Sequence, residues 1–158
     1  GTFMSVGQTF GREDLGADND FSQFNFDLVY ARAIGSHSGY GGLRYHDTTS
    51  GTPLLQNFYR LGGVTRLPGY RPNEAYYKNY ALGFVGYTYE LGRLLNRPAI
   101  IGGTIEYADL WNDGSFHQRE LHASAYFGFD SWLGRFLFGY GARESGEGTF
   151  FLELGRNR

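Results

Sequence analysis

The stretch ELHASAYFGFD at residues 120–130 alternates apolar side chains with polar or small ones over its whole length. Successive side chains of a β-strand point to opposite faces of a sheet, so this pattern predicts a strand with one apolar face. The same alternation recurs at 23–30, 84–91 and 149–154. The sequence therefore predicts an all-β fold.

Eight strands are predicted, in one domain that spans residues 1–158. Several exceed the roughly 5–6 residues that are usual for globular strands and match the roughly 9–11 residues of a tilted transmembrane strand. The predicted strands cover residues 2–10, 21–34, 39–47, 79–92, 98–110, 117–130, 135–143 and 148–156. This strand set predicts a transmembrane antiparallel β-barrel of about eight strands per chain.

The connections between these strands differ in length. Those at 35–39, 94–97 and 131–134 are short, whereas 48–78 is the longest. Outer-membrane barrels combine short periplasmic turns with long extracellular loops. We therefore expect 48–78 to be an extracellular loop, with both termini in the periplasm. Aromatic residues of the interfacial kind fall near strand ends: Tyr76, Tyr77, Tyr80, Trp111 and Trp132.

Composition narrows the function classes. Aromatic residues make up 18% of the chain, and the net charge of −2 gives no basic surface for nucleic acid. Cysteine is absent, so no disulfide framework or thiolate metal site is expected. The histidines lack ligand-like spacing, and Asp14, Asp18 and Asp20 are better explained as a solvated acidic loop than as a calcium site. No metal and no cofactor is expected.

A soluble β-sandwich or lipocalin-like barrel is the alternative fold, because its strands alternate as well. A soluble barrel turns its apolar face inward, and periodicity does not say which face is inside. The polar face here suits a wet or ion-paired lumen. Its members include Asp27, Arg44, Glu90, Glu106, Glu120 and His122.

The segment 57–92, NFYRLGGVTRLPGYRPNEAYYKNYALGFVGYTYELG, carries a family resemblance. Its Leu61-Gly62-Gly63 is followed by Arg66-Leu67-Pro68-Gly69-Tyr70, then by strands at 101–111 and 148–155. This order resembles the bacterial surface antigen domain of the BamA-type outer-membrane superfamily. It is closest to the barrel domain of patatin-like fused secretion proteins, in a short form without periplasmic N-terminal domains.

The resemblance implies a barrel in the outer membrane of a Gram-negative bacterium that assists protein insertion or secretion. Lipid and client proteins would be its partners. It also implies that Arg66, in the loop motif Gly62, Gly63, Arg66, Gly69 and Tyr70, forms a charge-assisted pair with Glu106 in the lumen. The three glycines permit positive φ and tight turns.

Size raises a further expectation. Family barrels have sixteen strands, about twice the number predicted here, and an eight-stranded barrel is just filled by its own side chains. Such a barrel has no room for the 48–78 loop inside it, which leaves three alternatives. The loop lies over the barrel mouth, two chains pair as half-barrels into one sixteen-stranded pore, or two small barrels associate. Homodimerisation is the preferred prediction, because an unpaired strand edge in lipid is costly.

Two other functions stay open, although no enzyme activity is expected. His122 and Ser124 project from one strand face and, with Glu120 or Glu153, could form a Ser-His-acid set. This spacing resembles that of the outer-membrane lipid A deacylase, although polar packing in the lumen is the favoured interpretation. The other alternative is a structural or adhesive surface protein that acts through residues 48–78.

Overall fold

The computed structural model describes residues 1–94, 96–112, 114 and 116–155. The eight predicted strands are confirmed, and they form one antiparallel sheet in the order β1-β2-β3-β6-β7-β8-β9-β10. Their bounds are β1 (Thr2–Gly11), β2 (Phe21–Ile34), β3 (His37–Gly51), β6 (Asn79–Leu94), β7 (Arg97–Trp111), β8 (His117–Ser131), β9 (Gly134–Arg143) and β10 (Gly148–Gly155). The largest difference is at β3, which stays paired with β2 four residues beyond its predicted end at 47. The predicted strand position 156 lies outside the described residues.

The long connection between β3 and β6 contains structure that the sequence pattern did not predict. Two short strands, β4 (Tyr59–Leu61) and β5 (Ala75–Tyr77), pair antiparallel within it. Short 3-10 turns lie at Glu13–Leu15 and Leu55–Asn57. Among the described residues, no helix is long and apolar enough to span a membrane.

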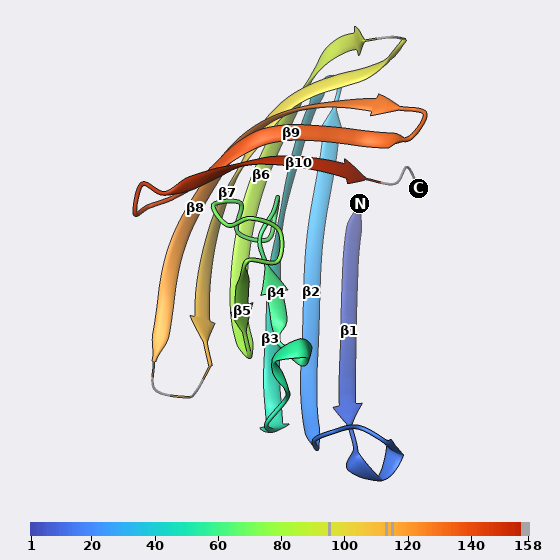
Figure 1. Cartoon of the computed structure of the whole chain (residues 1–158). Helices are drawn as coiled ribbons and strands as arrows, with labels where there is room; N and C mark the ends of the chain where they lie inside the picture. The colour runs from blue at the N-terminus through green and yellow to red at the C-terminus, as the bar shows by residue number, and fades with distance from the viewer. Residues whose placement is uncertain (95, 113, 115, 156–158) are drawn as a thin grey trace.

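The sheet is a meander in which each long strand lies beside its neighbours in sequence (Figure 1). Antiparallel order places the turns after β2, β6 and β8 at one end, together with the start of β1 and the end of β10. The connections 12–20, 52–78, 112–116 and 144–147 lie at the other end. The predicted separation is therefore present: the turns at the first end have two residues each, whereas the connections at the other end have between four residues, at 144–147, and 27 residues, at 52–78.

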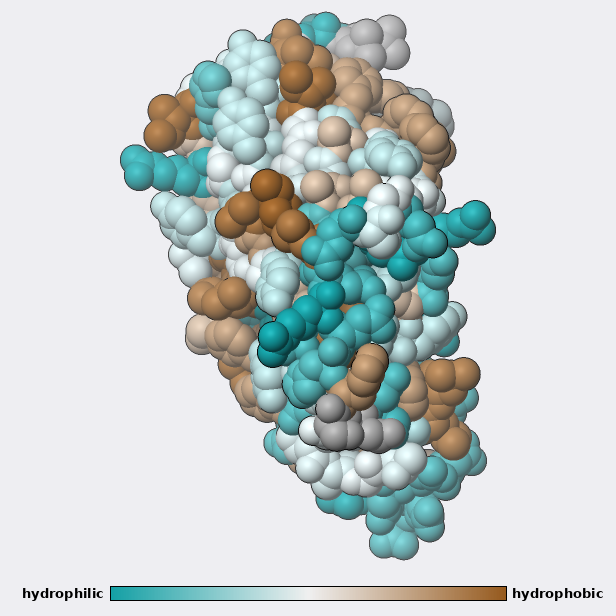
Figure 2. Space-filling model, turned by 90° about the vertical axis from the view of Figure 1, so that its left-hand side faces the viewer, coloured by the Kyte–Doolittle hydropathy of each residue, from teal (hydrophilic) through white to brown (hydrophobic). Residues whose placement is uncertain are grey.

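The two faces of the sheet have opposite chemistry. The outer face exposes large apolar side chains, while Glu106 and His122 on the concave face are 0% exposed. This is the reverse of a soluble barrel, whose apolar side chains point inward. The outer-face residues include Met4, Val6, Tyr30, Leu43, Val85, Tyr87, Ile105, Tyr107, Leu121, Phe138, Phe150 and Leu152. On the side that lies to the left in Figure 1, hydrophilic residues gather along the middle between hydrophobic groups (Figure 2).

The outer strands of the sheet have one neighbour each. Within the described residues, β1 pairs only with β2 and β10 pairs only with β9. The sheet is therefore curved but open, and its two edges offer unused backbone hydrogen-bonding groups.

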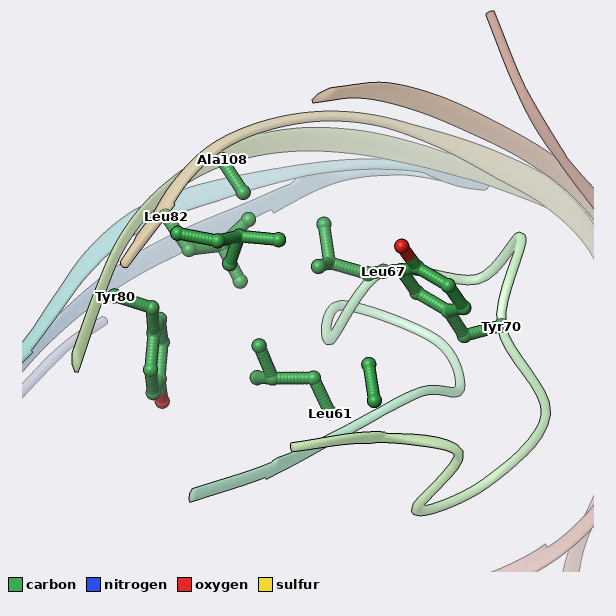
Figure 3. Packing of buried hydrophobic residues seen from close by; sticks show 8 residues of the cluster. Leu61, Leu67, Tyr70, Tyr80, Leu82 and Ala108 are labelled. Atoms are coloured by element: carbon green, nitrogen blue, oxygen red, sulfur yellow. The ribbon is translucent and has the colours of Figure 1, made fainter. Parts of the chain in front are cut away.

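The concave side is filled by the chain between β3 and β6. Leu61 and Leu67 from this connection lie beside Leu82 of β6 (Figure 3). Leu110 of β7 belongs to the same cluster, and all four side chains are at most 2% exposed. Of the placements that the sequence left open for this loop, the one over the mouth of a closed eight-stranded barrel is not observed. An open sheet of eight strands leaves room on its concave side that a closed barrel of eight strands would lack.

Candidate functional site

Glu106 holds the turn of the 62–70 segment against the sheet. Its carboxylate accepts backbone hydrogen bonds from Thr65 and Leu67, both at 2.8 Å, and one from the Thr104 hydroxyl at 2.9 Å. Thr65 and Leu67 both have left-handed backbones, with φ of 59° and 71°. Such conformations are costly for residues other than glycine and persist only where the surrounding structure imposes them. The carboxylate therefore fixes a strained turn.

The predicted Arg66–Glu106 ion pair is not formed. The Arg66 guanidinium instead donates a 2.8 Å hydrogen bond to the carbonyl oxygen of Arg60. The reason is geometric: the turn presents the amides on either side of Arg66 to the carboxylate, and these amides occupy both carboxylate oxygens. An anchor between this loop and Glu106 exists, but main-chain donors make it.

His122 holds the next part of the segment. The N–H of Gly69 donates to its Nδ1 atom at 3.1 Å, and Glu120 lies 2.8 Å from its Nε2 atom. Since the Gly69 amide can only donate, Nδ1 must accept and the ring proton sits on Nε2. His122 is thereby a neutral bridge between the loop backbone and the Glu120 carboxylate.

Tyr70 closes this network. Its hydroxyl donates to Glu120 at 2.7 Å, and the Arg143 guanidinium lies 4.6 Å from the centre of its ring. Burial and the hydrogen bond to Glu120 raise the pKa of the Tyr70 hydroxyl well above its ordinary value of 10.0. Arg143 also pairs with Glu147 at the β9–β10 turn.

The glycines of the motif have two different roles. Gly62 and Gly63 have φ of 128° and 103°, so the prediction of positive φ is confirmed for both. Gly69 has no positive φ. A Cβ there would lie 2.5 Å from Cγ of Arg143 and 2.9 Å from Nδ1 of His122, so Gly69 allows close approach to the sheet. Gly141 on β9 does the same for the loop, because its Cβ would lie 2.1 Å from the Pro68 carbonyl oxygen.

The candidate Ser-His-acid set is not assembled. The Ser124 hydroxyl bonds to the Thr104 hydroxyl at 2.7 Å, and both ring nitrogens of His122 have other partners. Glu153 accepts a 3.0 Å hydrogen bond from the N–H of Val64. Ser124 therefore has no base within this network, and Glu153 acts as a second anchor of the loop.

A second group of polar side chains, on β2 and β3, also contacts the loop. Asp27 lies 3.6 Å from Nε of Arg44 and 3.2 Å from Nε2 of His46. Arg44 also reaches the hydroxyl of Thr65, at 3.5 Å. The turn at Thr65 is thus contacted from β3 and from β7. No group of three or more His, Cys, Asp or Glu side chains among the described residues is arranged to hold a metal ion.

The sequence analysis named Glu106 as a partner of the loop and placed Glu120 and His122 on the polar face, but it did not predict that these two residues hold the loop. Thr65, Leu67 and Gly69 contribute backbone amides. Because every residue except proline has such an amide, the residue types could not predict these contacts. Arg143 could have been found by pairing the predicted strands, because it lies opposite His122 in the β8–β9 register.

No family model, no curated protein and no solved structure matches the chain. The resemblance of the 57–92 segment to the BamA-type superfamily therefore stays a prediction.

Proposed function

We propose that this chain supplies eight strands of a Gram-negative outer-membrane β-barrel that is wider than eight strands and holds the 52–78 segment in its lumen. The observation that supports this most directly is the inverted polarity of the sheet. Large apolar side chains such as Val85 (61% exposed) face outward, whereas Glu106 and His122 are fully buried on the concave side. A lipid environment would cover the outer face, and the docked loop satisfies the inner one.

The loop supports a wide barrel. A closed barrel of eight strands has an interior that its own side chains fill. Here Leu61, Leu67 and Pro68 occupy the concave space as fully buried residues. A closed barrel therefore needs further strands between β10 and β1, because unpaired backbone N–H and C=O groups are costly in lipid.

A second copy of the chain fits this requirement. With eight long strands, β1 and β10 run in opposite directions, so a two-fold axis along the barrel sets β10 of one copy antiparallel to β1 of the other. Two equal junctions would then complete a sixteen-stranded barrel with all termini on the periplasmic side. The absence of native cysteine makes this arrangement accessible to cross-linking.

The closure is tested with cysteines at Val6 on β1 and Leu152 on β10, joined by a short bismaleimide after folding in detergent. Covalent dimers in the double variant, together with a native mass of two chains, would support two-copy closure. Cross-links within single chains would instead show an eight-stranded barrel closed on itself and would refute the proposal. A monomer without cross-links would exclude the second copy as the closing partner.

Membrane insertion is tested by folding the protein into preformed lipid vesicles. Protease should leave the strands intact and cut at the loop end, and the folded band should migrate differently from the boiled one. Complete digestion in the presence of vesicles would refute the membrane assignment.

Within this class we propose a role in protein insertion or secretion, supported by the loop motif and its Glu106 anchor. Vesicles that contain the protein should accelerate the folding of a small eight-stranded reporter barrel, compared with vesicles that contain the Glu106→Ala variant. Equal rates with and without the protein would exclude the insertion role. Among the described residues, no specific contact favours the lipid-hydrolase or the adhesive alternative, since Ser124 lacks a base and Gly63, Gly69 and Tyr70 of the loop motif are buried.

A further inference from the structure

An open slot lies on the outer face of β3 at Gly39, near the end of the sheet that carries the short turns. The strand register places Arg32 of β2 on one side of Gly39 and Tyr87 of β6 on the other. A Cβ at Gly39 would meet no atom within 4 Å. The space between the Arg32 and Tyr87 side chains is therefore not filled by the protein.

Two groups that can donate hydrogen bonds lie beside this slot: the Arg32 side chain and the His37–Tyr87 pair. The Arg32 side chain is exposed and has no hydrogen bond or ion pair within the part of the chain that the structure describes. His37, diagonal to Arg32 across the β2–β3 pair, has its Nδ1 atom 2.5 Å from the Tyr87 hydroxyl. Glu90, next in sequence to Tyr89, alternates to the concave face, so it does not neutralise this cluster.

An apolar groove of about 550 Å³ lies on the same outer face, and its lining begins at Gly41, two residues from Gly39 along β3. Its floor includes Gly41, which lies on the same face of β3 as Gly39, and Gly83 of β6. The walls are formed by Leu28, Tyr30, Leu43, Val85, Ile105 and Tyr107. Each floor glycine lies opposite a large side chain in the register, Gly41 opposite Val85 and Gly83 opposite Leu43. The strand register thus creates the groove, because it sets each glycine beside a large apolar side chain.

We propose that this outer-face site binds one anionic phospholipid, with its phosphate in the Gly39 slot and an acyl chain in the groove. An exposed arginine fork matches phosphate geometry, and the hydrogen-bonded Tyr87–His37 pair leaves one further donor beside it, either the Tyr87 hydroxyl or Nε2 of His37. The apolar walls match a hydrocarbon chain. The site rests on the proposed membrane location, in which the short-turn end lies in the periplasmic leaflet.

The test is native mass spectrometry of the protein folded in detergent and titrated with phosphatidylglycerol or phosphatidylcholine of the same acyl chains. One phosphatidylglycerol should be retained in preference to phosphatidylcholine. Arg32→Gln should weaken this binding about fivefold, the effect of one arginine at an anionic lipid surface. Gly39→Leu should weaken it as well, although Arg32 remains, because leucine fills the slot.

Arg119→Gln is the matched control, since Arg119 is an exposed arginine on β8 at the opposite end of the sheet. It should leave phosphatidylglycerol binding unchanged. Equal retention of both lipids, or equal loss in all three variants, would overturn the site. Inorganic phosphate should not displace the lipid at millimolar concentration; displacement would show that the groove contributes nothing and would also overturn the lipid assignment.

The titration takes place in micelles and gives its answer whether or not the protein inserts into vesicles. A protein that inserts but shows no lipid preference removes the lipid site and leaves the barrel proposal standing. A protein that fails to insert removes the barrel proposal on separate grounds.

Discussion

The backbone N–H of Gly69 donates a 3.1 Å hydrogen bond to Nδ1 of His122, 53 residues further along the chain. This bond joins the loop between β3 and β6 to the centre of β8. Because it uses the neutral imidazole as an acceptor, the tautomer of His122, the ionised state of Glu120 and the position of the loop depend on one another.

His122→Leu should destabilise the fold strongly. Leucine fills a similar volume but leaves the Gly69 N–H and one Glu120 oxygen without partners, at about 1–3 kcal/mol for each. Urea unfolding in detergent micelles, followed by tryptophan fluorescence, measures the loss. His117→Leu is the control, because the His117 side chain is 41% exposed and should change the free energy of unfolding much less. Equal effects of the two changes would contradict the role of His122.

Glu106→Gln should release the strained turn at Thr65 and Leu67. The amide keeps one acceptor oxygen, so one of the two backbone N–H groups faces an amino group and loses its bond, at a cost of about 1–3 kcal/mol. Limited proteolysis with trypsin should then cleave at Arg66 or Arg71 faster than in the parent protein. The exposed Glu90 supplies the control Glu90→Gln. Unchanged cleavage rates in Glu106→Gln would show that the loop does not depend on this anchor.

Gly141→Ala should displace the loop tip from β9. The new Cβ would lie 2.1 Å from the Pro68 carbonyl oxygen, which belongs to the backbone and cannot simply rotate away. Overpacking of this kind costs about 1–3 kcal/mol. Gly39→Ala is the matched control, because its Cβ meets no atom within 4 Å. If both alanine variants unfold at the same urea concentration as the parent, the close packing of Pro68 on β9 is refuted.

Tyr70→Phe should lower stability at neutral pH and change its dependence on alkaline pH. The hydrogen bond to the Glu120 carboxylate contributes about 1.5–3 kcal/mol. The raised pKa of Tyr70 means that this stabilisation is complete below the unfolded-state value of 10.0 and is lost as the pH rises above it, by about 1.4 kcal/mol per pH unit.

The difference in unfolding free energy between the parent protein and Tyr70→Phe should therefore shrink between pH 10 and 11.5. Tyr76→Phe removes a hydroxyl from a residue that is 41% exposed and should show no such change. A difference that stays constant across this range would mean that Tyr70 ionises equally well in the folded protein.

Ser124→Ala should leave the acylation of membrane lipids unchanged when the protein is produced in cells. Ser124 contacts Thr104 and not His122, so no activated nucleophile is lost. The substitution should cost only about 1 kcal/mol of stability, through the lost hydroxyl–hydroxyl bond. Altered lipid acylation would restore the hydrolase alternative.

The sequence by itself determined the strands and which side chains share a face of the sheet. Side-chain alternation has a fixed period of two in a strand, so the sequence alone assigns residues such as Leu121 and His122 to opposite faces. The sequence also indicated positive φ at Gly62 and Gly63, because glycine is the residue that adopts such conformations most easily. The alternation of the strands also placed Glu106 and His122 together on the polar face.

Only the tertiary structure decided where the long loop lies and what holds it. The family resemblance implied a pairing of Arg66 with Glu106, which is a contact between two charged side chains. The bonds that formed instead use the backbone amides of Thr65 and Leu67, and every residue except proline carries such an amide. Which amides face a carboxylate depends on the turn and on the curvature of the sheet, and these are set by contacts between residues far apart in the chain.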